Sequence, residues 1–203
     1  MDKARIAVLV SGGGTNLQAL LDAQAAGIIE SGEIALVISN NSNAYALERA
    51  KKAGVSAETV IKADCGGQEG FEKKIEELLE TYKIDLIVLA GFMSILSESF
   101  TKNYPNRILN VHPSLIPSFC GKGYYGLRVH EEALAYGVKV TGATVHFVNE
   151  IPDGGKIILQ KAVAIEDGDT PEILQKRVME QAEWKILPAA VEMVCKTIVE
   201  KGN

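Results

Sequence analysis

Short apolar runs alternate with amphipathic stretches through the first half of the chain, and this alternation limits the possible folds more than any other feature. The run IAVLV (6–10) is continuously apolar and ends in glycines, as in a strand buried on both faces. Strands are predicted at 6–10, 33–40, 56–61, 85–91 and 107–112, and helices at 17–27, 46–54 and 71–82. Strands that alternate with helices through short connections predict a parallel, doubly wound α/β sheet.

The pattern changes beyond Gly142. Two strand-like stretches, 143–150 and 156–165, are separated only by IPDGG, which predicts an antiparallel hairpin added late to the sheet. One long C-terminal helix is predicted from about Thr170 to Val199, with Thr170 as its N-cap and Pro171 in its first turn. No repeat or linker divides the chain, so we expect a single domain over residues 1–203.

Composition and charge exclude several classes of function. A net charge of −5 argues against a basic face that follows a nucleic-acid backbone. Three cysteines without C-x-x-C spacing argue against a disulfide framework or a zinc site, and for a reducing compartment. The chain has no apolar signal core and no run near the roughly 18 apolar residues that cross a bilayer. We therefore expect a cytoplasmic protein that binds neither nucleic acid nor membrane.

A glycine-rich loop, SGGGTN (11–16), connects the first predicted strand to the first helix. Glycines let the backbone approach a ligand, and the following helix directs free N–H groups and a partial positive charge at the loop. Leu17 stands where a dinucleotide fingerprint needs a third glycine, and no Walker A sequence follows. The loop thus predicts a site for a single phosphate, with a purely structural tight turn as the alternative.

Polar residues follow three of the later strands, where ligands gather in a doubly wound sheet. Asn110 and His112 are two residues apart in an extended segment, so their side chains share a face. Asp153 lies in the connection between the last two strands. Buried polar side chains of this kind are either hydrogen-bonded core groups or functional ones, and residue type alone leaves both interpretations open.

Four segments together resemble the folate-dependent formyltransferases, in particular those whose acceptor is a glycinamide ribonucleotide. They are SGGGTNLQAL (11–20), LAGFMSIL (89–96), NVHPSLIP (110–117) and VHFVNEIPDGG (145–155), and the resemblance runs over about residues 5–195. It implies a Rossmann-like formyltransferase fold, 10-formyltetrahydrofolate as cosubstrate, no metal, and formyl transfer to the ribonucleotide in purine (IMP) biosynthesis. A monomer or a homodimer is compatible with it.

The resemblance also implies a catalytic trio of Asn110, His112 and Asp153. A primary amine attacks the formyl carbon, and the carbonyl oxygen becomes an oxyanion that a protonated His112 and the Asn110 amide can stabilise. Asp153 is expected to keep His112 charged, because an adjacent carboxylate raises the pKa of a histidine. The same carboxylate could help to move a proton from the attacking amine to the leaving folate nitrogen.

The remaining implied contacts divide between the two substrates. Four residues are assigned to the ribonucleotide: Gly14, Thr15, Asn16 and Glu183. Four residues are assigned to the folate: Met93, Ile95, Leu96 and Asn110. For the apolar members of the second set, ordinary core packing is the alternative. Of the other histidines, His130 is predicted to be a surface residue and His146 a strand-packing residue.

Three places depart from the family pattern. Ser94 stands where many relatives have an arginine, so a polar folate contact is missing or replaced. The run SFCGKGYYGLR (118–128), between Pro117 and Val129, is longer than in some relatives, and its glycines and two tyrosines predict a mobile flap over the site, Gly121–Arg128. Lys122 or Arg128 could meet the glutamate tail of the folate. In the last helix, Glu180 would repel a phosphate, so either the helix is shifted or Gln181 takes its place.

Three other functions remain as alternatives. A formyltetrahydrofolate deformylase or a methionyl-tRNA formyltransferase shares the asparagine, histidine and aspartate. The former is expected to carry a further domain before this core, and the latter a further domain after it with a basic surface. A non-catalytic nucleotide-binding module would use the glycine loop and keep the polar cluster only for structure.

Overall fold

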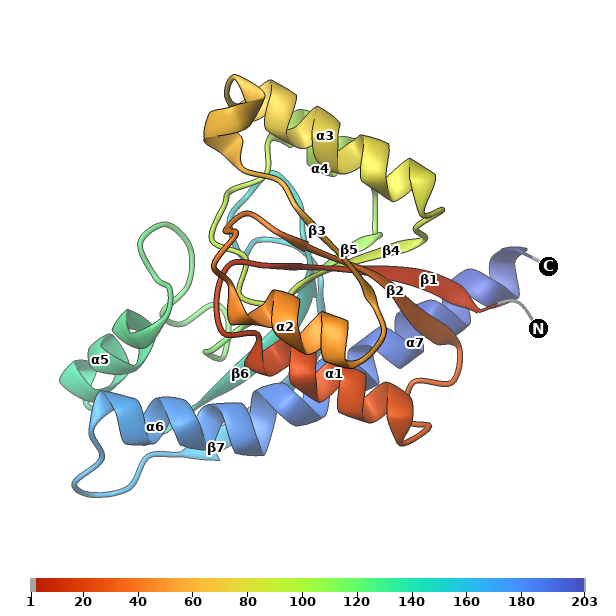
Figure 1. Ribbon diagram of the computed structural model, residues 1–203. Coiled ribbons are helices and arrows are strands. Elements are labelled where there is room, and N and C mark those ends of the chain that lie inside the picture. Colours follow the sequence, from red (N-terminus) through yellow and green to blue (C-terminus); the bar gives the residue numbers. More distant parts are fainter. Residues whose placement is uncertain (1–2, 203) are drawn as a thin grey trace.

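The structure, a computed structural model, describes residues 3–202, so Met1, Asp2 and Asn203 of the predicted domain lie outside the described residues. Seven strands form one sheet in the order β3-β2-β1-β4-β5-β6-β7 (Figure 1). Their bounds are β1 Ala4–Val10, β2 Gly32–Ser39, β3 Ser56–Thr59, β4 Leu86–Leu89, β5 Ile108–His112, β6 Val140–Phe147 and β7 Ile157–Ala164. Strands β1 to β5 pair in parallel, whereas β6 is antiparallel to both β5 and β7. The predicted fold class is confirmed.

Helices cover both faces of this sheet. They are α1 Thr15–Ala25, α2 Tyr45–Lys52, α3 Gln68–Thr81, α4 Glu98–Asn103, α5 Leu127–Tyr136, α6 Pro171–Val178 and α7 Trp184–Gly202. Helices α3 and α4 lie above the sheet in Figure 1, and α1, α2 and α7 lie below it. Within residues 3–202, no helix is both long and apolar enough to cross a bilayer.

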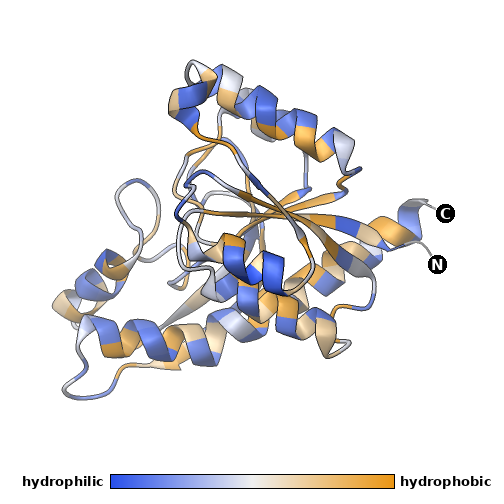
Figure 2. Cartoon of the chain, viewed as in Figure 1, coloured by the Kyte–Doolittle hydropathy of each residue, from blue (hydrophilic) through white to orange (hydrophobic). Residues whose placement is uncertain are grey.

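Alternate residues of the central strand β1 supply both cores. Ile6, Val8 and Val10 pack into the core shared with α1 and α7, while Ala7 and Leu9 pack into the core shared with α3. This two-sided burial explains the continuous apolar run in the sequence. Figure 2 shows the consequence: the central strands are largely apolar, and the helices carry many hydrophilic residues.

The predicted long C-terminal helix is confirmed, but a π-helical turn lies inside it. Helix α6 ends at Val178, the π-helical turn η2 (Met179–Glu183) follows, and α7 begins at Trp184. No glycine or proline marks this break in the sequence. The wider turn directs the side chain of Glu183 inward, where it is buried and accepts a hydrogen bond from the α1 residue Asn16. A π-turn of this kind often occurs at a functional site.

Three short helices were not predicted, because none carries a long periodic pattern. They are the 3₁₀ turn η1 (Lys62–Cys65), the six-residue α4, and α5, which begins inside the predicted flap. The glycines just before Leu127 obscured the start of α5, whose buried face consists of Val129, His130 and Ala133.

The late antiparallel pair is confirmed, but its connection is longer than the predicted IPDGG. It runs from residue 148 to residue 156, between β6 and β7. A Cβ atom on Gly155 would lie 1.7 Å from the carbonyl oxygen of Phe147, so only glycine fits at this close approach of the backbone. Asp153, with a positive φ of 55°, stands at the tip of this connection and lies over the end of β5.

Candidate active site

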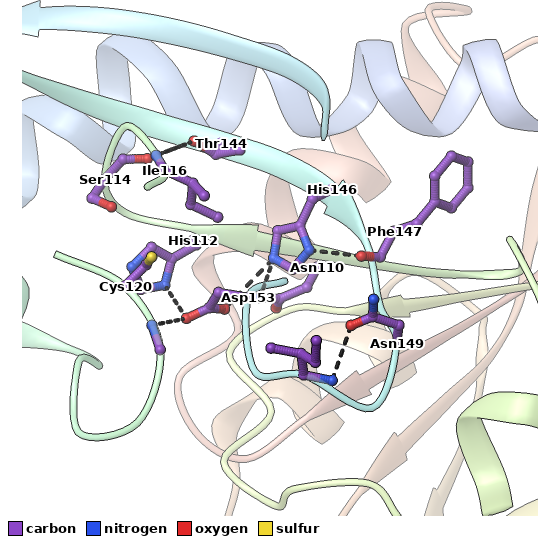
Figure 3. Close-up of polar contacts among 12 residues, drawn as sticks. Asn110, His112, Ser114, Ile116, Cys120, Thr144, His146, Phe147, Asn149 and Asp153 are labelled. Atoms are coloured by element: carbon purple, nitrogen blue, oxygen red, sulfur yellow. Dashed lines mark hydrogen bonds and ion pairs between the residues drawn. The ribbon is translucent and has the colours of Figure 1, made fainter. Parts of the chain in front are cut away.

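The polar cluster is built on two paired strands. Asn110 of β5 lies directly opposite His146 of β6 in the antiparallel register. The Nδ1 atom of His146 lies 2.8 Å from the carbonyl oxygen of Phe147, so Nδ1 carries the proton and donates it. The Nε2 atom of His146 is then an acceptor, 3.2 Å from the Asn110 amide nitrogen (Figure 3). One N–H of the Asn110 amide remains for a substrate oxygen.

His112 is oriented by a backbone carbonyl. Its Nε2 atom lies 2.8 Å from the oxygen of Phe119 and donates to it, because a carbonyl oxygen can only accept. The other ring nitrogen, Nδ1, faces Asp153 at 3.5 Å from Oδ2. The proton that titrates on this imidazole is therefore the one beside the carboxylate.

Asp153 lies between two imidazoles. Its Oδ1 atom is 3.6 Å from Nε2 of His146, and its Oδ2 atom accepts a 2.8 Å hydrogen bond from the backbone N–H of Gly121. Figure 3 shows the carboxylate pointing at His112 on one side and at His146 on the other. The structure thus brings together Asn110, His112 and Asp153, and it adds His146 to them.

The charge state of the cluster differs from the expectation for His112. Burial lowers the pKa of His112, and the attraction of Asp153 and the hydrogen bond to Phe119 offset this only in part. The pKa of Asp153 is also lowered: burial acts against its charged form, but the proximity of the His146 and His112 imidazoles and the hydrogen bond from the Gly121 N–H outweigh it. Without substrate, the cluster therefore holds a charged carboxylate beside a neutral His112 at neutral pH.

The two remaining histidines also depart from the sequence interpretation. His130 is not a surface residue: it is completely buried on α5, and within residues 3–202 neither of its ring nitrogens has a hydrogen-bond partner. This burial lowers the pKa of His130 to about 4. His146 does pack in its strand, but it also belongs to the polar cluster. The sequence does not reveal that His146 lies opposite Asn110, because this pairing depends on the register between β5 and β6.

A cavity of about 130 Å³ adjoins the cluster between the loop after β4 and the connection after β6. Asn110, Asp153, Ile95 and Leu96 are among the residues that line it. Met93, although also assigned to the folate, is exposed and lies outside this lining, and its N–H donates to Ser11 Oγ.

Ser94 lies in the wall of the same cavity. Its hydroxyl oxygen accepts a 2.8 Å hydrogen bond from the side-chain amide of Asn40. Many relatives are expected to carry an arginine at this position. Here it is occupied by a short, neutral hydroxyl group, which is hydrogen-bonded to the residue that follows β2.

The glycine loop has the features of an anion site. Gly14 adopts a positive φ of 72° at the N-terminus of α1, where no side chain caps the helix and no acidic residue stands in the first turn. The guanidinium of Arg49 on α2 lies against the loop and donates from Nε to the carbonyl oxygen of Gly13 at 2.8 Å. Free N–H groups, the helix dipole and a cation favour a bound anion. No motif in the sequence pointed to Arg49.

Asn16 and Glu183 form a buried pair beside this loop. The Asn16 amide donates to Glu183 Oε2 at 2.7 Å, and burial raises the pKa of Glu183 to about 6. The carbonyl oxygen Oδ1 of Asn16 is buried and has no partner in the described part of the chain, so a donor on a ligand could satisfy it. Thr15 is exposed at the same helix end.

Glu180 and Gln181 are both exposed on the π-turn. Glu180 lies 3.8 Å from Lys176, which partly neutralises the acidic group expected near the phosphate.

The predicted flap is anchored at its base. Its first glycine, Gly121, donates to Asp153, and Phe119 packs edge-on against Tyr124 with ring centroids 6.3 Å apart. Lys122 is exposed, and Arg128 belongs to α5, where it lies 3.8 Å from Glu132. Through the backbone of residues 119–121, the flap touches both His112 and Asp153.

Comparison with known proteins agrees with this geometry. A family model described as formyl transferase matches residues 4–191. Phosphoribosylglycinamide formyltransferase from Escherichia coli is 40% identical over 186 residues, which cover 92% of this chain and 84% of that protein. A crystal structure of glycinamide ribonucleotide transformylase 1 from Symbiobacterium toebii superposes with a TM-score of 0.89 at 44% identity, covering 96% of this chain and 89% of the other.

The same core also occurs within larger proteins. The human trifunctional purine biosynthetic protein adenosine-3 is 44% identical over 201 residues, which cover 99% of this chain but only 19% of that protein. This chain therefore spans about one fifth of the trifunctional relatives. On the family model, the identities and the shared fold, the chain belongs to the formyl transferase family, among the phosphoribosylglycinamide formyltransferases.

Proposed function

We propose that the chain transfers the formyl group of 10-formyltetrahydrofolate to the amine of N1-(5-phospho-D-ribosyl)glycinamide, giving the N-formyl product and tetrahydrofolate in purine (IMP) biosynthesis. The observation that carries the proposal is the cluster of Asn110, His112 and Asp153 beside a cavity, in a chain of this family. The glycine loop with Asn16 and Glu183 supports the choice of a phosphorylated, amine-bearing acceptor.

In the proposed mechanism, the amine forms a bond to the formyl carbon and the carbonyl oxygen becomes an oxyanion. The free N–H of Asn110 stabilises this oxygen. His112, neutral in the free protein, gains affinity for a proton as the negative charge develops, because an opposite charge favours the imidazolium. The proton that it holds is the one released by the attacking amine, which reaches it through Asp153 and later returns through Asp153 to the folate nitrogen. The Phe119 carbonyl keeps the ring in the orientation that leaves Nδ1 for this role.

Asp153 completes the proton balance. The attacking nitrogen must lose a proton, and the folate nitrogen must gain one when its bond to the formyl carbon breaks. A carboxylate that accepts a hydrogen bond from the Gly121 N–H and keeps a lowered pKa can accept the first proton and deliver the second, directly or through water. The reaction needs no oxidant and no metal in this scheme.

The two substrates are assigned to adjoining parts of the carboxyl edge of the sheet. We assign Ile95, Leu96 and Asn110 to the folate, with Met93 at its exposed margin. We assign Gly14, Thr15, Asn16 and Glu183 to the ribonucleotide. The protein is further proposed to act as one domain over residues 1–203, in the cytoplasm, as a monomer or a homodimer, without nucleic-acid or membrane partners.

A label-transfer experiment tests this proposal. Protein is incubated with folate that carries an isotope in the formyl carbon, together with the ribonucleotide, and the products are separated. The label should appear on the ribonucleotide. Label released as formate would instead identify a deformylase, and label that stays on the folate with every acceptor would leave only a binding function.

A further inference from the structure

Helix α3 carries a buried carboxylate that the proposed chemistry does not use. Glu72 lies in the first turns of this helix, and only 6% of the residue is exposed. Within residues 3–202, no lysine or arginine forms an ion pair with it. A buried charge without a cation is costly unless several hydrogen-bond donors surround it, so its surroundings require an explanation.

Three donors surround the Glu72 carboxylate. The backbone N–H of Ser97 donates to Oε1 at 2.6 Å, and the Ser97 hydroxyl donates to Oε2 at 2.5 Å. The side-chain amide of Gln68, one turn earlier on α3, also donates to Oε1 at 2.5 Å. Because an ionised carboxylate only accepts, this arrangement suits glutamate better than any neutral side chain of the same shape.

These bonds hold a short stretch of loop, Ile95–Ser97, which we call the wall segment. Gln68 donates not only to Glu72 but also to the carbonyl oxygen of Ile95 at 3.0 Å, so both ends of the wall segment are tied to α3. The Ser97 hydroxyl in turn accepts from the N–H of Phe100 and caps α4. The wall segment is therefore held by α3 at both of its ends.

The wall segment forms one side of the cavity beside the polar cluster. Ile95 and Leu96 line this cavity together with Asn110 and Asp153. Helix α3 supports the preceding part of the same loop as well, because the ring of Phe71 stacks on that of Phe92, with centroids 6.4 Å apart and planes 8° apart. Helix α3 thus determines where the wall stands relative to the groups that would act on the formyl carbon.

We propose that Glu72 is a positioning residue for folate binding: its carboxylate, with Gln68, fixes the wall segment and so sets the width of the cavity. The inference rests on the proposed function for the identity of the ligand. Glu72 does not touch the reacting atoms, so its loss should weaken the binding of folate in ground state and transition state alike. Loss of uniform binding raises KM and leaves kcat unchanged.

The test compares Glu72→Gln with wild type. Calorimetric titration with the dideaza analogue of 10-formyltetrahydrofolate measures Kd, and steady-state assays measure KM for each substrate and kcat. Replacing the carboxylate by an amide removes charge-assisted hydrogen bonds, so Kd and KM for the folate should rise roughly 10-fold. The KM for the ribonucleotide and kcat at saturating folate should stay at the wild-type values.

Two further variants separate positioning from simple stability. Gln68→Ala frees the carbonyl of Ile95 but leaves the Glu72–Ser97 bonds, so it should raise the folate Kd by a smaller factor. Glu77→Gln is the matched control, because this glutamate lies on the exposed side of α3 and its side chain pairs, among residues 3–202, only with Lys74; this variant should bind folate as wild type does.

Each outcome decides the inference. A lower Tm for Glu72→Gln, together with an equal rise in KM for both substrates, would show a purely structural role and overturn the inference. An unchanged folate Kd would also overturn it. Wild-type protein that binds the analogue but does not formylate the ribonucleotide would refute the proposed acceptor, while a raised Kd in Glu72→Gln would still support the positioning role. Wild-type protein that does not bind the analogue would overturn both.

Discussion

Burial and charge act in opposite directions on His112. Burial lowers the pKa of this imidazole, and the neighbouring Asp153 recovers only part of the loss. A histidine that is neutral before the reaction and takes a proton as the oxyanion forms gives differential stabilisation of the transition state. The sequence allowed Asn110, His112 and Asp153 to be chosen, but the sign of this pKa shift depends on how deeply the ring is buried in the folded protein.

Replacing Asp153 by asparagine should lower turnover while the fold is retained. The variant removes both the proton acceptor and the charge that raises the pKa of His112, so turnover should fall by about 10²- to 10⁴-fold, the usual range for lost acid–base catalysis. Single-turnover kinetics measure the effect, and circular dichroism checks the fold. A rate close to wild type would remove Asp153 from the mechanism.

Glu183 should make stability depend on pH. Its pKa in the folded protein is about 6, against an ordinary value of 4.5, so the folded state holds the proton more tightly than the unfolded state. The stabilising contribution is complete below the unfolded value and is lost as the pH rises through about 6. Relative to Glu183→Gln, the free energy of unfolding should fall by about 2 kcal/mol between roughly pH 4 and pH 7.

Urea titrations of both proteins across this range measure the difference. Parallel pH curves for wild type and Glu183→Gln would show that Glu183 is ionised at the same pH in both states.

At the scale of single elements, the ends of strands and helices carry the site. The glycine loop between β1 and α1 is recognisable in the sequence, because three consecutive glycines after a strand indicate a backbone that turns sharply or approaches a ligand closely. The π-turn that directs Glu183 towards Asn16 is not recognisable, because MEQAE contains no helix breaker and its register depends on packing against α1. The start of α5 was not predicted for another reason: the glycines just before Leu127 favour a loop.

Gly14→Ala tests whether the loop geometry is required. An alanine there would need a φ of +72° and would place its Cβ 2.7 Å from the Cβ of Ala46. Strain in this region should cost about 1–3 kcal/mol of stability. The KM for the ribonucleotide should also rise, since the loop would move.

Gly27→Ala is the control, because it has nearly the same φ, +71°, with no atom within 4 Å of the added Cβ. The difference between the stability lost in Gly14→Ala and that lost in Gly27→Ala then measures the effect of the contact with Ala46. Equal losses in the two variants, with normal ribonucleotide binding in Gly14→Ala, would contradict the role given to the loop.

At the scale of the whole molecule, one sheet brings together segments far apart in the chain. The parallel strands place the glycine loop, the loop after β4 and the end of β5 on the same edge, and the antiparallel β6 and β7 return Asp153 to that edge. The alternation of apolar runs with helical stretches was sufficient to predict this sheet, because burial on both faces leaves continuous apolar runs in the sequence. It could not predict the pairing of Asn110 with His146, which depends on strand register, or the support from Glu72, which depends on how α3 packs.

The most direct test of the account is a spectrophotometric assay of folate release with and without glycinamide ribonucleotide, using wild type and His112→Ala. We predict release by wild type only when the ribonucleotide is present, and none above background by His112→Ala. Release that is independent of the ribonucleotide, or an unchanged rate in His112→Ala, would contradict the proposed transfer and the role of the cluster.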